Sequence, residues 1–436
     1  MMPANWLSKK IFLVSLVLLY RVTLDWSYVT VLEPYFMHLG FVLNWSLSRL
    51  LESYFLTVVA SLLLPASIRR PSDLLVFLLF VISVCPTMSV YALRGGSELF
   101  AWMAIAAFAM VSICRQGKRL IVPRMREGRF LGLSAAVFGT ALVTIWLIAS
   151  GGLNYFNLDL LNVYQYREVV RSELYSGLFG YLNQWAFRIF NVTLIAVALH
   201  KRNWFFFVCL LGLQVFFFGI SSEKKVLFVP LLVLLLYGLH KTKYSPQMLM
   251  IAGIFGVAAA TWAAQLFDQV LPFSLSVRRM LFTPATLNFA YHEFFGAAGH
   301  VLWSTGPLSF LFEYPYEETP ALMISYHMRG TTDIWMNNGF LGASYMHFGY
   351  IGMLFFGAII GFLARIVDSL VIDRLPMWLG LSIVIVPFFN MFTGADLTTA
   401  FGTHGLGVGL VILWLIGLES NRRSGTRIRA IQSSST

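Results

Sequence analysis

The amino-acid sequence predicts an all-α polytopic integral membrane protein, with about 12 transmembrane helices in a single transmembrane domain over residues 1–436. Apolar residues make up 58% of the chain and charged residues 12%, a balance that excludes an ordinary soluble domain. Apolar stretches recur along the chain at the length of about 20 residues that crossing the hydrocarbon layer requires. The basic residues between them alternate from one side to the other, which is typical of membrane topology.

The predicted crossings follow one another from the N-terminus. They begin near Ile11, Leu47, Leu74, Leu99, Phe130, Tyr181, Trp204, Val226, Met248, Leu341, Met377 and Gly402. The crossings from Trp204 and Val226 are joined only by Ser221–Lys225, which is the tightest of the predicted junctions.

The basic residues give the orientation. With the N-terminus in the cytoplasm, twenty of the 31 Lys and Arg residues fall in cytoplasmic segments, as the positive-inside rule requires. Both termini are then cytoplasmic. The pI of about 9.6 therefore reflects topology and contact with membrane lipids, and it does not indicate nucleic acid as a partner. The other eleven basic residues lie on the external side or at membrane depth, where a charge is costly and calls for an explanation.

Two external loops, residues 151–180 and 268–340, are longer than a hairpin connection. Loops of this length in a compact fold are usually functional or disordered. Both are rich in aromatic residues, which disordered segments lack. We therefore expect the functional residues in or beside these loops.

The first loop offers a pair of cations. Arg167 and Arg171 are four residues apart, so in a helix they project from one face and can act as a two-cation clamp. Glu168 and Glu173 are the alternative, because they can neutralise both arginines on a solvated surface helix. Arg188 lies about two turns into an apolar stretch, where we favour an inward-facing role over snorkelling to the surface.

The second loop offers another pair, Arg278 and Arg279, a few residues before Pro284. Proline suits the first turn of a helix, so we expect a helix to begin at Pro284. Guanidinium groups and the free N–H groups of a helix start can converge on phosphate oxygens. Contact with lipid headgroups is the alternative for this pair.

Histidines and carboxylates in the second loop are candidate general bases. The four that we single out are His292, Glu293, His327 and Asp333. The histidines show no metal-ligand spacing such as HxxxH, and the three cysteines are scattered through apolar stretches. We therefore expect no metal site.

Three groups of residues resemble the O-antigen or capsule repeat-unit polymerase (Wzy-type) superfamily. They are Tyr166-Arg167 with Gly180-Tyr181-Leu182-Asn183-Gln184-Trp185, Arg278-Arg279-Met280-Leu281-Phe282-Thr283-Pro284 with Tyr291 and Phe294-Phe295, and Asn338-Gly339-Phe340-Leu341-Gly342 with Tyr345, Phe348-Gly349 and Gly352. The resemblance covers about residues 150–365, and the hydropathy profile extends it to the whole chain.

The resemblance implies a glycosyltransferase with a GT-C-like fold in the bacterial inner membrane, with both long loops in the periplasm. Such enzymes join oligosaccharide repeat units that are carried on undecaprenyl pyrophosphate. A hydroxyl of one lipid-linked unit attacks the growing chain, and undecaprenyl pyrophosphate leaves. No nucleotide, metal or other cofactor is implied. A chain-length regulator and a flippase are further candidate partners.

The chemistry of this reaction selects the candidate residues. A pyrophosphate leaving group needs fixed positive charge in a site of low dielectric constant, and the attacking hydroxyl is helped by a base. The predicted substrate-binding residues are Arg167, Arg171, Arg188, Arg278, Arg279, Tyr291, Arg329 and Asn338. The predicted bases are the four residues named above.

Two alternatives stay open. An O-antigen ligase, which transfers finished polysaccharide to lipid A core, uses similar chemistry and carries a histidine in its large loop. A lipid-linked oligosaccharide transporter or flippase belongs to another class, and it should show two repeated halves with broken or charged spans. We find no such repeat in the sequence.

Overall fold

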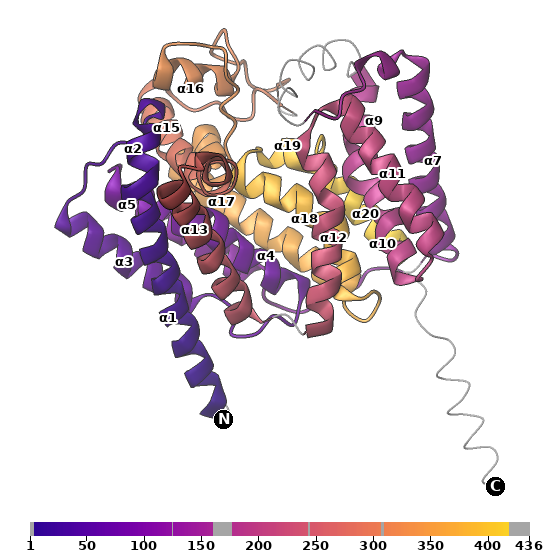
Figure 1. The fold of residues 1–436 in the computed structure, drawn as a ribbon, viewed down its shortest axis with the longest axis horizontal. Helices are drawn as coiled ribbons and strands as arrows, with labels where there is room; N and C mark the ends of the chain where they lie inside the picture. Colours follow the sequence, from indigo (N-terminus) through magenta and orange to yellow (C-terminus); the bar gives the residue numbers. More distant parts are fainter. Residues whose placement is uncertain (1–3, 124, 160–176, 243–244, 307–308, 418–436) are drawn as a thin grey trace. The chain divides into compact units, whose positions relative to one another are not determined.

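The structure is a computed structural model that describes residues 4–123, 125–159, 177–242, 245–306 and 309–417 (Figure 1). Arg167 and Arg171 lie outside these residues. All regular secondary structure in the described part is helical, with no strand. The predicted all-α class is therefore confirmed.

Eight helical segments of the described chain are long and apolar enough to cross a membrane. They are Pro71–Leu93, Gly128–Ala149, Gly177–His200, Trp204–Ser221, Lys224–Thr242, Pro246–Phe267, Phe340–Val371 and Leu397–Ile416. Two further apolar helices, α6 (Glu98–Cys114) and α18 (Met377–Thr393), are shorter. The remaining predicted crossings are also helical: α1 (Ala4–Ser27) carries four charged residues, and α3 (Leu47–Leu62) has 16 residues. The chain is thus a multi-pass helical membrane protein.

Two compact units make up the fold, and each gathers segments that are far apart in the sequence. Unit 1 comprises Met1–Lys118, Thr242–Arg365 and Pro387–Phe401, and unit 2 comprises Arg119–Lys241, Ile366–Val386 and Gly402–Thr436. Each unit carries one of the two long predicted loops, residues 268–340 in unit 1 and residues 151–180 in unit 2. We call the end of the helices where this loop attaches the loop end of the unit. The other end is called the opposite end.

In unit 1, α1 continues without a break through the π-helical η1 (Tyr28–Leu32) into α2 (Glu33–Phe36), and η2 (Met37–Leu39) follows. The next segments are α3, α4 (Pro71–Leu79), the π-helical η3 (Phe80–Val84), α5 (Cys85–Leu93) and α6, with α13 (Pro246–Phe267) much later in the chain. Serine side chains cap the N-termini of α3, α6 and α13 by accepting a backbone N–H bond. Helices α1, α3 and α5 pack side by side (Figure 1).

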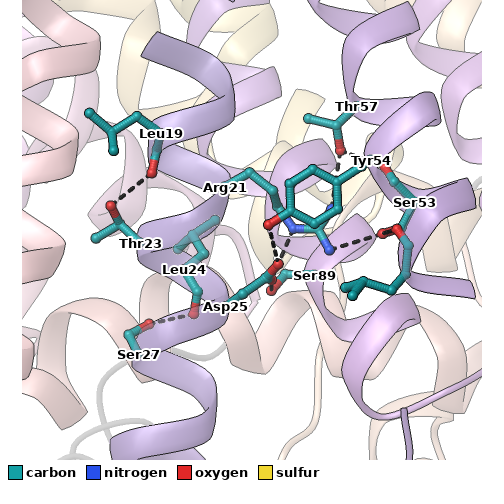
Figure 2. Close-up of polar contacts among 11 residues, drawn as sticks. Leu19, Arg21, Thr23, Leu24, Asp25, Ser27, Ser53, Tyr54, Thr57 and Ser89 are labelled. Atoms are coloured by element: carbon teal, nitrogen blue, oxygen red, sulfur yellow. Dashed lines mark hydrogen bonds and ion pairs between the residues drawn. The ribbon is translucent and has the colours of Figure 1, made fainter. Parts of the chain in front are cut away.

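A buried charge pair ties these three helices together (Figure 2). The side chain of Arg21 is fully buried, and its Nε donates to Asp25 Oδ1 at 2.9 Å. Its other two nitrogens donate to the hydroxyls of Thr57 and Ser53 on α3, at 3.2 and 3.1 Å. Asp25 also accepts from Ser89 on α5, at 2.5 Å. An ion pair among apolar helices persists only with such additional hydrogen bonds.

The second long loop is largely helical. Helix α14 (Val270–Phe273), the π-helical η6 (Ser274–Phe282) and α15 (Thr283–Ala298) form one continuous helix, because Phe282 and Thr283 both have helical dihedral angles. Pro284 lies in the first turn of α15, as the sequence predicts, but α15 continues η6 and so has no free N-terminus there. After α15 come α16 (Pro320–Arg329) and α17 (Phe340–Val371), and α17 is kinked at Phe348 and Gly349.

Unit 2 contains α7 (Gly128–Ala149), η4 (Gly152–Tyr155), α9 (Gly177–Trp185), the π-helical η5 (Ala186–Phe190), α10 (Asn191–His200), α11 (Trp204–Ser221), α12 (Lys224–Thr242) and α20 (Leu406–Ile416). The last turns of α17 and the first part of α18 also belong to it, whereas α19 (Leu397–Phe401) belongs to unit 1. The tight junction before α12 is a turn between two helices, as the sequence predicts. Buried amides join α10 to α11, because Asn191 Nδ2 donates to Gln214 Oε1 at 2.6 Å.

Candidate functional site

At the loop end of unit 2, a buried arginine is paired with a carboxylate. Only 6% of Arg188 is exposed, so it faces the interior as the sequence predicts. Its Nη2 donates to Glu223 Oε2 at 2.8 Å. Glu223 lies in the turn between α11 and α12, and its Oε1 accepts from Gln184 Nε2 at 3.1 Å. The turn and the π-helical η5 thus bring both charges together.

Several buried polar atoms of this cluster have no hydrogen-bond partner among the described residues. Nη1 of Arg188 and Oε1 of Gln184 are buried and have no hydrogen-bond partner among the described residues. His404 lies within electrostatic range of Arg188 and Glu223, and its Nδ1 is likewise buried without such a partner. Trp185 holds this part of the chain close by, because its Nε1 donates to the Gly402 carbonyl at 2.8 Å.

Polar atoms that are buried without a partner are rare, and each one indicates a missing water or ligand, or strain. The cluster around Arg188 therefore offers donors and acceptors to a polar molecule. A guanidinium whose Nη1 is not engaged can donate to a phosphate oxygen or to a sugar hydroxyl.

At the loop end of unit 1, the imidazole of His292 on α15 lies against aromatic rings. Its Nε2 is 2.8 Å from the hydroxyl of Tyr350, and its ring centroid is 4.6 Å from that of Tyr345 and 5.1 Å from that of Phe100. Burial among these rings lowers the pKa of His292 below its usual value. The imidazole is therefore neutral near pH 7, and a neutral imidazole can accept a proton.

The neighbouring carboxylate, Glu293, is held by a cation that the sequence did not single out. Arg94, directly after α5, places its Nη1 3.5 Å from Glu293 Oε1, and its Nε donates to the Gly40 carbonyl at 3.3 Å. The Glu293 side chain is 44% exposed and that of Arg94 18%, so the pair lies at the surface. The signal in the sequence was a lone arginine in the short external turn before Glu98.

Arg278 and Arg279 lie within η6 and not ahead of a helix. Arg278 donates to Ser274 Oγ from Nε and Nη2, at 3.1 and 2.7 Å, and its guanidinium carbon is 4.7 Å from the centroid of the Phe36 ring. Arg279 is exposed. Because the helix continues through Pro284, the expected contribution of free N–H groups to an anion site is absent here. The two arginines can contact an anion through their side chains only.

Tyr291 and Asn338 are buried among protein groups. The Tyr291 hydroxyl donates to the Met336 carbonyl at 2.9 Å, and burial raises the pKa of this phenol. Asn338 Nδ2 donates to Asn288 Oδ1 at 2.9 Å, and Asn288 Nδ2 donates to Thr87 Oγ1 at 2.9 Å. These contacts join α15 to α5 and to the start of α17, so they hold the segment that carries His292 in place.

The remaining candidates are at the surface. His327 and Arg329 on α16 and Asp333 after it are exposed. The His327 ring lies 5.5 Å from that of Phe294. The structure thus brings His292, Glu293 and Arg94 together in unit 1, whereas Arg188 belongs to unit 2.

The sequence also did not predict one buried pair in unit 1, His347 with Asp396. His347 is 1% exposed, its Nδ1 accepts from the backbone N–H of Trp303 at 3.0 Å, and its Nε2 is 3.4 Å from Asp396 Oδ1. Burial of Asp396 favours its neutral form, but the interactions with His347 and Thr398 outweigh this and lower the pKa of the carboxyl. The pair fixes the start of α17 just before its kink.

No family model, no curated protein and no solved structure matches this chain. Among the described residues, no three His, Cys, Asp or Glu side chains are grouped so as to hold a metal ion.

Proposed function

We propose that the chain is a GT-C-type glycosyltransferase with twelve transmembrane helices that polymerises undecaprenyl-pyrophosphate-linked oligosaccharide repeat units into O-antigen, capsule or exopolysaccharide. In this proposal the loop ends of both units face the periplasm, and the opposite ends with both termini face the cytoplasm of a bacterial inner membrane. The observation that carries the proposal is Arg188, a buried cation at a loop end with an Nη1 that no described residue engages.

Arg188 fits the donor side of the reaction. A pyrophosphate leaving group gains negative charge as its bond to the sugar breaks, and a fixed guanidinium in a site that excludes water stabilises this charge. Glu223 accepts from Nη2, and Nη1 has no hydrogen-bond partner among the described residues, so it is the nitrogen proposed to donate to the pyrophosphate. Arg278 and Arg279 are proposed as further contacts of the pyrophosphate, together with Arg167, Arg171 and Arg329.

His292 fits the acceptor side. A sugar hydroxyl of the incoming unit attacks the anomeric carbon of the growing chain, the bond from this carbon to the pyrophosphate oxygen breaks, and the hydroxyl proton passes to a base. His292 is neutral near pH 7 and half-buried, which suits proton acceptance. Glu293, His327 and Asp333 are the other proposed bases.

The test is polymerisation by the purified full chain with lipid-linked repeat units as the sole substrate. Arg188→Lys and Arg188→Ala should each lower the rate at least about tenfold, because lysine lacks the planar fork of a guanidinium. Excess EDTA should leave the wild-type rate unchanged, since no chelator removes an arginine charge. The product should be a polymer on undecaprenyl pyrophosphate.

Arg115→Lys is the matched control. Arg115 is 7% exposed, close to the value for Arg188, and it also pairs with a carboxylate, that of Asp73 at 2.5 Å. It lies at the opposite end of unit 1, so its loss should affect folding and not polymerisation. Equal rates for Arg188→Lys and wild type would remove Arg188 from the mechanism. Transfer to lipid A core without polymer would identify a ligase, and lipid translocation without bond formation a transporter.

A further inference from the structure

We propose that the cluster around Arg188 also recognises the sugar that carries the pyrophosphate, through a hydrogen-bond donor on the carbon next to the anomeric carbon. This recognition rests on the proposed function, in which Nη1 of Arg188 donates to the pyrophosphate. The residue that it adds to the site is Gln184, whose Oε1 accepts from a hydroxyl or an acetamido N–H group of the sugar.

Gln184 and Arg188 bind the same carboxylate. Gln184 Nε2 donates to Glu223 Oε1 at 3.1 Å, and Arg188 Nη2 donates to Glu223 Oε2 at 2.8 Å. Each of these two buried side chains has a second polar atom without a partner among the described residues, Oε1 in Gln184 and Nη1 in Arg188. Because both side chains are anchored on one carboxylate, the two unpartnered atoms belong to one site.

The carboxylate also determines which amide atom of Gln184 is left over. A carboxylate accepts hydrogen bonds and does not donate them, so it must face the amide nitrogen. The oxygen, Oε1, is therefore the atom of Gln184 that is buried without a partner. A buried acceptor of this kind is costly unless a donor reaches it.

The two unpartnered atoms have opposite roles in hydrogen bonding. A guanidinium N–H donates, whereas an amide oxygen accepts. An ionised pyrophosphate accepts only, so it can engage Arg188 Nη1 but not Gln184 Oε1. A ligand that satisfies both atoms needs a donor close to its phosphate. In a sugar pyrophosphate, the hydroxyl or acetamido group next to the anomeric carbon has this position.

Two further polar side chains lie around this site. Ser222 directly precedes Glu223, and its buried Oγ has no partner among the described residues. His404, whose Nδ1 is also unpartnered, lies in the turn before α20. This turn packs against α9, since a Cβ at Gly405 would lie 3.0 Å from the ring of Trp185. A hydroxyl and an imidazole can each bind another hydroxyl of the same sugar ring.

The test compares two synthetic lipids that have the same charge and differ in one hydroxyl. They are undecaprenyl pyrophosphate that carries glucose and undecaprenyl pyrophosphate that carries 2-deoxyglucose. Calorimetric titration of the purified full chain in detergent measures the affinity for each. A site built to bind a hydroxyl discriminates against the analogue that lacks it. We expect the wild-type chain to bind the glucose lipid about tenfold more tightly.

Gln184→Met removes the acceptor and keeps the length of the side chain. It should bind both lipids with the same affinity. Gln214→Met is the matched control, because Gln214 is also a buried glutamine of unit 2 but has partners for both amide atoms. Its Oε1 accepts from Asn191, and its Nε2 donates to the carbonyls of Phe187 and Val226. This variant should keep the tenfold preference.

The ratio of the two affinities separates the possible outcomes. Equal binding of both lipids by the wild type would overturn the sugar contact and leave the pyrophosphate contact of Arg188 in place. Failure to bind either lipid would overturn the proposed function as well. A preference that persists in Gln184→Met would exclude Gln184 as the acceptor. The wild-type comparison requires no variant, so it decides the question even if Gln184→Met does not fold.

Discussion

Two buried arginines illustrate how single residues of this chain differ in what they do. Each of the three guanidinium nitrogens of Arg21 has a partner within unit 1. Nη1 of Arg188 has none among the described residues of unit 2. A completed set of hydrogen bonds stabilises packing, and an incomplete one leaves a donor for a ligand. Burial alone would have given both residues the same role.

We therefore expect Arg21 to stabilise the fold of unit 1. Arg21→Ala leaves Asp25 as an unpaired charge between helices, and we expect it to lower the free energy of unfolding by about 3–5 kcal/mol. Thermal unfolding in detergent measures this. The double variant Arg21→Met with Asp25→Leu should recover much of the loss, since it removes both charges. A single variant as stable as wild type would show that the pair contributes nothing.

His292 should give the reaction its pH dependence. A free histidine has a pKa of about 6.5, and burial lowers the pKa of His292. The base form therefore persists below pH 6.5, and the acidic limb of the rate profile should lie below that value. Its protonation also opposes folding, so the chain should lose stability as pH falls through 6.5 and below.

His292→Gln should reduce the polymerisation rate about 100-fold or more at every pH, which is the usual contribution of a general base. His240→Gln, at the exposed end of α12, is the control and should leave the profile unchanged. An acidic limb that persists in His292→Gln would assign the base to another residue.

At the scale of elements, the sequence predicts where helices lie better than where they bend. Twelve apolar stretches coincide with helices, because apolar length is a direct requirement of the membrane. Pro284 lies in the first turn of α15, as the sequence predicts, but the absence of a free helix end there has a physical reason. Proline clashes with the carbonyl four residues earlier in an α-helix, but the π-helical η6 is wider, and the Thr283 N–H bonds to the Arg278 carbonyl instead. A local widening of this kind leaves no mark in hydropathy.

The kink of α17 depends on one glycine. Gly349 has φ +60°, and a Cβ there would lie 2.9 Å from His300 Nε2. Gly349→Ala should therefore lower the free energy of unfolding by about 1–3 kcal/mol, the usual cost of a strained backbone residue. Gly256→Ala on α13 is the control, because a Cβ there meets nothing within 4 Å. It should leave the free energy of unfolding unchanged or raise it slightly. Equal midpoints for the two variants would mean that the kink tolerates a side chain.

For the whole molecule, we expect the distribution of basic residues to set the orientation in the membrane, and reporter fusions test this directly. Reporter fusions at Asn157 and Pro315, both near loop ends, should report the periplasm, and a fusion after Lys201 should report the cytoplasm. The reason is that only this orientation keeps most basic residues inside. A cytoplasmic signal at Asn157 or Pro315 would reverse the orientation and place the proposed reaction on the wrong side.

The sequence located Arg188, His292 and Glu293 but not their partners. Glu223 and Arg94 sit in short turns, and which helix a turn residue meets depends on packing between segments distant in sequence. For the same reason, the sequence did not predict the division of the fold into two units. The segments Met1–Lys118 and Thr242–Arg365 belong to unit 1 because they contact each other, and a hydropathy profile does not show such contacts.

The interleaving of the two units constrains the order in which the chain can mature during synthesis. Unit 1 lacks its last segment, Pro387–Phe401, until most of the polypeptide has been made. At about 5–20 residues per second, its first helices wait in the membrane for tens of seconds. The Arg21–Asp25 pair finds all its partners before residue 94. The buried charges of Arg21 and Asp25 therefore have their full set of partners long before the last segment of unit 1 is translated.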